Sequence, residues 1–170
     1  MIETTSAEGI RASLNRKALA SARHRAALGR LLGLAEGEVL AIQHLARAGR
    51  MTPSQLGSAL RLSSGGATAL VQRLERGGHV ARDPHPHDGR SVLLRLTPQI
   101  EARAGEALAP LVAEIDALTA RLSDDERALV ADFLARVAEA GERHADELAR
   151  SAGDAAPAGA GGSPVPGLWA

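Results

Sequence analysis

Two signals for the start of an α-helix lie close together in the middle of this chain, and they constrain the fold more than any other feature. Thr52 followed by Pro53 is a typical N-cap and first helical residue, and Ser63 is a second N-cap soon afterwards. The first helix must therefore be short and end near Leu60. The second helix is predicted over residues 64–76, because its apolar residues recur at helical spacing, at Ala67, Leu70, Val71 and Leu74.

After this second helix the hydrophobic period changes from helical to alternating. Gly77 and Gly78 end the helix, and the segments HVARD and SVLLRL that follow are short and rich in β-branched residues. The segment between them, PHPHDGR, contains two prolines and a glycine. These features predict a two-stranded β-hairpin with a long tip.

Longer helices are predicted on both sides of this central region. On the N-terminal side we predict one over residues 7–32 and another in LAEGEVLAIQHLARAG, which stops at Gly49. On the C-terminal side, a cap followed by proline starts a long helix at Thr97-Pro98, and Ser123 with Glu126 forms a capping box before a last helix. The predicted apolar positions are Val39, Ile42, Leu45 and Ala46; Leu108, Leu111, Val112, Ile115, Leu118 and Leu122; and Leu129, Phe133, Leu134, Val137 and Leu148.

The composition agrees with a helical protein whose core is aliphatic. Hydrophobic residues make up 45% of the chain and aromatic residues only 1%, so Leu, Val and Ala must fill the core. The chain has no Cys, which excludes disulfide bonds and thiol-based redox sensing. We see no signal peptide and no membrane-spanning stretch, so we expect a cytoplasmic protein without a membrane partner. Residues 151–170 are expected to be a disordered tail, in which Trp169 is exposed.

Charge is unevenly distributed along a chain whose net charge is zero. Residues 50–96 carry seven Lys and Arg against three Asp and Glu, whereas residues 97–170 carry six against thirteen. A basic central region beside an acidic C-terminal half indicates that the centre meets an anion. Chance asymmetry between solvated surfaces is the alternative.

The sequence contains no motif for catalysis or for a cofactor. The adjacent glycines Gly65 and Gly66 lack the following Lys-Ser/Thr of a phosphate-binding loop, and no strand is predicted before them. His79, His85 and His87 are not accompanied by Cys or by an ordered cluster of carboxylates, so we expect no metal there. We expect these histidines instead to add positive charge near the hairpin at low pH. The protein is therefore expected not to be an enzyme.

Two short helices with a tight connection, followed by a hairpin with a basic tip, make a winged helix-turn-helix. The predicted fold is thus mainly α with a small β-hairpin wing. The segment MTPSQLGSALRLSSGGATALVQRLERGGHVARDPHPHDGRSVLLRLTP resembles the multiple antibiotic resistance regulator (MarR) family of bacterial transcription factors. The residues that carry the resemblance are Arg73-Leu74-Glu75, Gly78, Asp88-Gly89-Arg90 and Leu96-Thr97-Pro98.

The resemblance implies a homodimer that binds double-stranded DNA, with one recognition helix on each half-site of a pseudo-palindromic operator. The predicted organisation is an N-terminal dimerisation helix over 1–35, a DNA-binding domain over 36–97, C-terminal dimerisation helices over 98–150 and the tail. The Leu and Ala stripes of the flanking segments are too extensive for a monomer to bury, which favours the same conclusion.

The resemblance places the wing-tip residue Arg90 in the minor groove of DNA. A narrow A·T-rich minor groove concentrates negative potential, which attracts a guanidinium. Asp88 is expected to hold Arg90 or the turn through a charge-assisted hydrogen bond. The alternative for Arg90 is a solvated surface arginine.

The exposed face of the recognition helix supplies the other DNA-contact candidates. Thr68 and Gln72 are the candidates for contacts to base edges. Side chains that could read bases are missing at Gly65 and Gly66, where the family often has Ser or Thr, but a bare backbone there can approach a phosphate closely. The candidates at the starts of the two helices of the motif are Ser64, Gly65, Gly66, Arg50, Ser54 and Gln55.

Two arginines in the last turn of the recognition helix are also DNA-contact candidates. Arg73 and Arg76 are predicted to contact the DNA backbone. For Arg73, an intramolecular ion pair with Glu75 or Asp83 is the alternative.

We therefore predict a DNA-binding transcriptional regulator, expected to be a repressor. The resemblance also implies a small-molecule effector, often an aromatic acid, that binds between the dimer helices and the winged domain and weakens DNA binding. The chain has one Phe and one Trp, which argues against a pocket built on aromatic stacking. The alternative function is a winged-helix protein-interaction module without DNA binding, and the basic wing argues against it.

Overall fold

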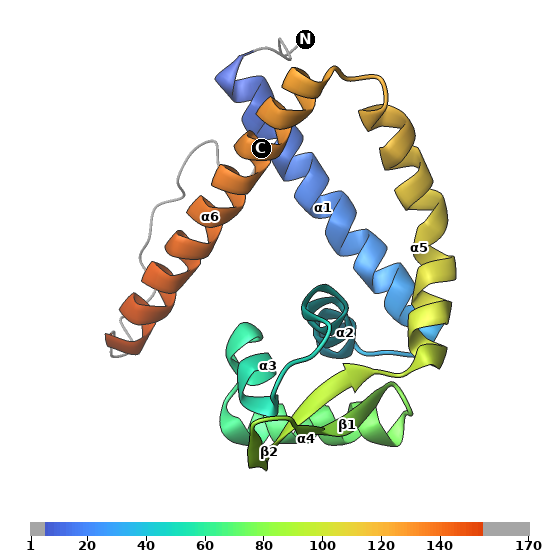
Figure 1. Cartoon of the computed structure of the whole chain (residues 1–170). Helices are drawn as coiled ribbons and strands as arrows, with labels where there is room; N and C mark the ends of the chain where they lie inside the picture. Colours follow the sequence, from blue (N-terminus) through green and yellow to red (C-terminus); the bar gives the residue numbers. More distant parts are fainter. Residues whose placement is uncertain (1–5, 155–170) are drawn as a thin grey trace. The chain divides into compact units, whose positions relative to one another are not determined.

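The structure, a computed structural model, describes residues 6–154, apart from the side chains of residues 88–90 and 152–154. Its elements follow in the order α1 (Ala7–Leu32), α2 (Glu36–Ala48), α3 (Pro53–Ala59), α4 (Ser64–Arg76), β1 (Val80–His85), β2 (Asp88–Leu96), α5 (Pro98–Thr119) and α6 (Asp124–Asp154). They form two compact units, one that ends at Pro110 and one that begins at Leu111. The prediction of a mainly helical fold with a two-stranded hairpin is confirmed (Figure 1).

The helices of the central motif begin where their caps predict. The Thr52 hydroxyl accepts a hydrogen bond from the Gln55 amide at 3.2 Å, and the Ser63 hydroxyl accepts one from the Gly66 amide at 3.2 Å. Each cap thereby satisfies an amide that has no partner within the first turn of its helix. These local bonds explain why α3 and α4 have the predicted bounds.

The core of the first unit lies between α2, α3, α4 and the hairpin, which are grouped together in Figure 1. All four predicted apolar residues of α4 are buried. On α2 the prediction is wrong at one position, because Ala46 is exposed whereas Ala41 is fully buried. The helix is therefore turned slightly from the predicted orientation, so that Ala41 lies beside the buried Leu45.

The hairpin has a much shorter tip than predicted. Strands β1 and β2 pair antiparallel from Val80 opposite Leu96 to Pro84 opposite Val92, and the register then shifts so that His85 lies opposite Asp88. A β-bulge of this kind takes up extra residues within a strand. Because each strand of a two-stranded sheet has one free edge, a proline is tolerated in it. Most of PHPHDGR therefore belongs to the strands, and only residues 86–87 form the turn.

The outer edge of β2 is tied to the connection between α2 and α3. Met51 and Leu94 exchange two backbone hydrogen bonds, of 3.2 Å and 2.7 Å. At the base of the hairpin, the Thr97 hydroxyl donates to the Gly78 carbonyl oxygen at 2.7 Å. These bonds fix the wing against the helical part of the first unit.

Two amphipathic helical segments make up the described part of the second unit. The predicted capping box at the start of α6 is confirmed, since the Ser123 amide donates to Glu126 Oε2 at 2.8 Å and the Glu126 amide donates to Ser123 Oγ at 3.2 Å. Leu122 lies beyond the end of α5, so it does not belong to that helix's stripe as predicted. Helix α6 continues to Asp154, and the rest of the predicted tail, with Trp169, lies outside the described residues. Among the described helices, none is long and apolar enough to cross a membrane.

Candidate nucleic-acid interface

Close packing between α3 and α4 fixes the position of α4, the predicted recognition helix. A Cβ atom on Gly57 would lie 2.8 Å from the Cβ atom of Ala67, closer than such atoms approach in proteins. Gly57 therefore allows the Ala67 side chain to lie directly against the backbone of α3. Both residues are buried, so the contact leaves the opposite side of α4 exposed.

The exposed side of α4 carries every predicted contact residue of that helix except Gly66, which is partly buried. The two glycines differ in their surroundings. A Cβ atom on Gly65 would meet nothing within 4 Å, whereas one on Gly66 would lie 3.3 Å from Ser63 Oγ. Gly66 thus leaves room for the cap of its own helix, and Gly65 presents open backbone at the surface.

Two of the polar candidates on α4 are partly engaged with their own helix. The Thr68 hydroxyl donates to the Ser64 carbonyl oxygen at 2.9 Å, and Arg76 Nε donates to the Gln72 carbonyl oxygen at 3.3 Å. The Thr68 oxygen keeps its lone pairs, so it can accept a hydrogen bond from a base amino group. Arg76 keeps its terminal guanidinium donors for a phosphate.

Arg73 has a different partner from either of those predicted. Its Nε lies 3.2 Å from Glu38 Oε1 on α2. Glu75 instead accepts two bonds from Arg82 on β1, at 2.6 Å and 2.9 Å, and these bonds raise the pKa of the Arg82 guanidinium. The prediction of Glu75 or Asp83 as the partner is therefore wrong, because the carboxylate that reaches Arg73 comes from a helix distant in the sequence.

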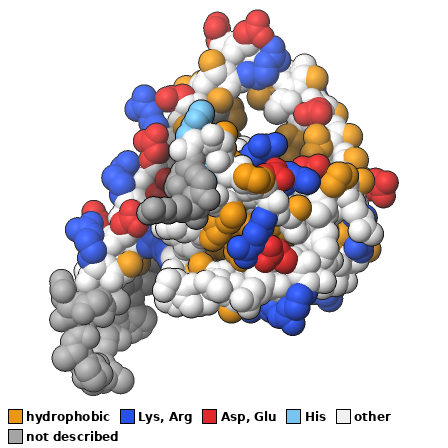
Figure 2. Space-filling view, turned by 60° about the horizontal axis from the view of Figure 1, so that its bottom comes forward, with side chains coloured by type: hydrophobic (Ala, Val, Ile, Leu, Met, Phe, Trp, Pro, Cys, Tyr) orange, Lys and Arg blue, Asp and Glu red, His pale blue; other side chains and the backbone are white. Residues whose placement is uncertain are grey.

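Asp83 forms a second cluster at the base of the wing. Its carboxylate accepts from Arg95 Nε at 3.1 Å and lies 3.6 Å from a terminal nitrogen of Arg50. Arg50, predicted as a phosphate contact, thus lies beside an acid. Figure 2 shows Lys and Arg side chains next to Asp and Glu side chains on the face of the molecule that is turned forward.

Helix α3 contributes one residue with a structural role and one candidate that sequence reasoning missed. Gln55 Oε1 accepts from the Thr52 amide at 2.8 Å, so this predicted contact residue closes the capping box of α3. A hollow of about 290 Å³ lies between α3 and α4 and is lined by the predicted Ser54, Ser64 and Thr68 together with Ser58. The spacing of Ser54 and Ser58, one helical turn apart, was a usable signal for Ser58.

At the wing tip, the backbone of Asp88 and Arg90 belongs to β2, and their side chains lie outside the described residues. The His85 and His87 rings lie edge to face with centroids 6.3 Å apart, and the His87 amide donates to His85 Nδ1 at 3.3 Å. No group of three or more potential metal ligands occurs among the residues that the structure describes.

Comparison with known proteins identifies the family. The sequence profile of the MarR family matches residues 32–91. YcgE of Bacillus subtilis, an uncharacterized HTH-type transcriptional regulator, is 32% identical over 125 residues, which cover 74% of this chain and 80% of YcgE. The chain belongs to the MarR family.

Further similarities agree with this membership. This chain is also 29% identical to the HTH-type transcriptional repressor YetL of B. subtilis. The similarity extends over 104 residues, which make up 60% of this chain and 62% of YetL. The crystal structure of wild-type MarR (apo form) from E. coli has a TM-score of 0.52 at 25% identity, covering 79% of this chain and 98% of that one. The transcriptional regulator Tm0710 from Thermotoga maritima shares the fold, with a TM-score of 0.57 at 22% identity over 81% of this chain and 97% of its own.

The protein is thus a transcriptional regulator of the MarR family with a winged helix-turn-helix fold. Its relatives are transcriptional regulators and not enzymes. The family match at residues 32–91 spans α2, α3, α4 and most of the hairpin, which are the elements that position the candidate interface.

Proposed function

We propose that this MarR-family regulator represses transcription by binding a pseudo-palindromic operator as a homodimer in the cytoplasm. The observation that carries the proposal is the exposed face of α4, on which open backbone at Gly65 and the side chains of Thr68, Gln72 and Arg76 lie together. Backbone amides and guanidinium groups suit phosphates, and hydroxyl and amide groups suit base edges. The name of the relative YetL, a repressor, supports the sign of regulation.

The wing is proposed to add a minor-groove contact through Arg90, with Asp88 as its support. Replacing Arg90 with Ala is expected to weaken operator binding by about 1–3 kcal/mol and to leave the melting temperature nearly unchanged. Fluorescence anisotropy with a labelled duplex measures the first quantity, and thermal unfolding measures the second. Unchanged affinity would remove Arg90 from the interface.

A second copy of the chain is the proposed partner of the C-terminal helices. Large apolar side chains are exposed along both α5 and α6, and the most exposed are Leu118, at 63%, and Leu129, at 70%. Apolar surface of this extent is unusual on a monomer and typical of an interface. The same stripe also includes Leu111, Val112, Ile115, Val130, Phe133 and Leu134.

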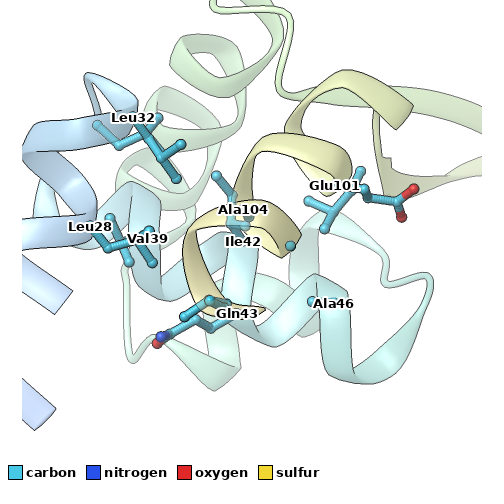
Figure 3. A pocket seen from close by; sticks show the side chains of 12 residues that line it. Leu28, Leu32, Val39, Ile42, Gln43, Ala46, Glu101 and Ala104 are labelled. Atoms are coloured by element: carbon cyan, nitrogen blue, oxygen red, sulfur yellow. The ribbon is translucent and has the colours of Figure 1, made fainter. Parts of the chain in front are cut away.

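A cavity in the first unit is the proposed site of a small-molecule effector. It has a volume of about 300 Å³, near the lower end of the range for ligand pockets, and lies between α1, α2 and the start of α5. Figure 3 shows the side chains of Leu28, Val39 and Ile42 within it, whereas the polar ends of Gln43 and Glu101 point outward.

The lining of this cavity favours an uncharged apolar ligand over an aromatic acid. No Lys, Arg or His is among the residues that line it, so a bound carboxylate would have no cationic partner, and the one charged residue, Glu101, carries the same sign as an anion. An uncharged effector is expected to raise the melting temperature and weaken operator binding. A matched carboxylic acid, such as benzoate against benzyl alcohol, is expected to do neither.

Recovery of DNA from genomic fragments by the purified protein tests the proposed function. We expect enrichment of a discrete set of fragments that share a pseudo-palindrome, and increased transcription of the adjacent genes when the protein is absent. Enrichment of no sequence, together with a protein partner that binds through the wing, would favour the protein-interaction module instead.

A further inference from the structure

Helix α4 and the wing are joined by a short connection that contains two adjacent glycines. Gly77 is the C-cap of α4, and Gly78 has a left-handed φ of 69° before β1 begins at Val80. Glycine restrains the backbone less than any other residue, so the connection by itself would let the hairpin swing against the helix. Other contacts must therefore set the angle between α4 and the wing.

Backbone hydrogen bonds fix the base of the hairpin, where the chain leaves the helix. The His79 amide donates to the Leu74 carbonyl oxygen at 2.9 Å, and the Thr97 amide donates to the His79 carbonyl oxygen at 3.0 Å. The turn of the hairpin, at residues 86–87, lies at the opposite end of the strands. A contact at the base restrains the far end of the hairpin only weakly, so the outer part of the wing needs support further along β1.

An ion pair between α4 and β1 supplies this support. Arg82 lies on the same face of β1 as the buried Val80, which is the face turned toward the core. Its Nε and one terminal nitrogen donate to the two carboxylate oxygens of Glu75, in the last turn of α4, at 2.6 Å and 2.9 Å. A guanidinium that binds both oxygens of a carboxylate has a defined orientation, which an ordinary surface ion pair lacks.

We propose that Glu75 and Arg82 are positioning residues, which hold the wing at the angle from which Arg90 reaches the minor groove while α4 lies in the major groove. This inference rests on the proposed DNA-binding function and on its wing contact. Neither Glu75 nor Arg82 needs to touch DNA itself. Their effect on affinity should therefore depend on Arg90 and disappear when the Arg90 side chain is absent.

A double substitution that leaves the net charge unchanged tests the proposal. Glu75→Gln with Arg82→Gln removes one negative and one positive charge, so the overall attraction to DNA is kept while the bidentate contact is lost. We expect this variant to bind the operator at least roughly fivefold more weakly than the wild type, which is the lower end of the loss from removing one groove contact. Fluorescence anisotropy measures the affinity, and thermal unfolding shows that the variant is folded at the assay temperature.

The Arg90→Ala background separates positioning from a general structural effect. Combined with Arg90→Ala, the double substitution should cause no further loss, because the contact that it positions is already missing. A defect in folding or in α4 itself would instead persist in both backgrounds. In hydroxyl-radical footprinting, the double variant should lose protection of the minor groove beside each half-site and keep its protection of the major groove.

Two further variants serve as controls. Arg82→Lys keeps the charge but not the bidentate geometry, so its loss of affinity should be smaller and should also vanish with Arg90→Ala. On α6, Asp132 and Arg136 form an ion pair at 2.9 Å. Asp132→Asn with Arg136→Gln removes that pair without changing the net charge, and it should leave the operator affinity unchanged.

The results that overturn the inference differ from those that overturn the proposed function. If Arg90→Ala weakens binding but the double glutamine variant binds as the wild type does, Glu75 and Arg82 do not position the wing. An equal loss with and without the Arg90 side chain would also overturn the inference, because it would place the effect in α4. If the wild-type protein binds no operator, or Arg90→Ala binds as tightly as the wild type, the proposed function or its wing contact fails, and this inference fails with it.

Discussion

At the scale of single residues, the two adjacent glycines at the start of α4 have different reasons to be there. Gly66 lies against the cap of its own helix, since a side chain there would come within 3.3 Å of Ser63 Oγ. Gly65 faces open space and has no packing reason to lack a side chain. We propose that the missing side chain at Gly65 lets DNA approach the backbone closely.

Replacing Gly65 with Ala is therefore expected to separate stability from binding. Alanine favours the helix and fits without contact, so the free energy of unfolding should rise by up to about 1 kcal/mol. The added methyl group should weaken DNA binding severalfold. Thermal unfolding and anisotropy measure the two effects, and Gly66→Ala is the control, with a smaller gain in stability because it presses on the cap. A Gly65→Ala variant that binds DNA as well as the wild type would show that the backbone there is not approached.

Breaking the ion pair between Arg73 and Glu38 is expected to increase the affinity for DNA. Arg73 is about half exposed, and Glu38 holds it against α2. Glu38→Gln should free the guanidinium for a phosphate, so the salt slope should steepen by about 0.9 per contacting subunit. The Glu38 side chain is partly buried and also accepts a hydrogen bond from the Ala35 amide, which a glutamine can keep, so stability should fall by no more than about 1 kcal/mol. Glu36→Gln makes the same charge change on α2, and an equal effect from it would rule out a specific release of Arg73.

At the scale of elements, a structural feature could be predicted from the sequence where the residues that cause it lie within the same element. The bounds and the buried face of α4 were predictable because the cap at Ser63 and the spacing of the apolar residues lie within the helix itself. The tip of the wing was not, because the register shift at His85 is set by pairing with β2. The partner of Arg73 was missed for the same reason, since Glu38 approaches it through tertiary packing. Contacts by Thr68, Gln72 and Arg90 with DNA remain predictions.

The start of α6 should become less ordered in acid. Hydrogen bonds from the Ser123 backbone and side chain lower the pKa of Glu126 below its ordinary value of 4.5. A carboxyl group with a lowered pKa stabilises the folded form above its unfolded pKa, and this stabilisation is lost as the pH falls through the folded pKa. We expect amide-exchange protection at Ser123 to fall below about pH 4.5. Glu126→Gln should remove this pH dependence, and a wild-type protection that stays constant down to pH 3 would contradict it.

At the scale of the whole molecule, the apolar stripe on α5 and α6 is the feature that most needs a partner. Phe133 is 40% exposed on α6. A charge there would have to be buried in a dimer interface, so Phe133→Glu should convert a dimer to a monomer and weaken operator binding by removing one of two half-site contacts. Light scattering coupled to size exclusion measures the mass.

A control on the same helix makes this result specific. Ala135 is exposed two residues further along, on the opposite side of α6. Ala135→Glu adds the same charge and should leave a dimer intact. A wild-type protein that is monomeric at all concentrations would contradict the proposed dimer.

The most direct test of DNA binding is the salt dependence of affinity for DNA from the region upstream of the protein's own gene. Each neutralised phosphate releases counterions, so log affinity should fall linearly with log salt, with a steep slope that reflects several contacts from two subunits. We expect this steep decline, together with tighter binding to the upstream fragment than to a random duplex of equal length. An affinity that is independent of salt, or equal for the two duplexes at every salt concentration, would contradict it.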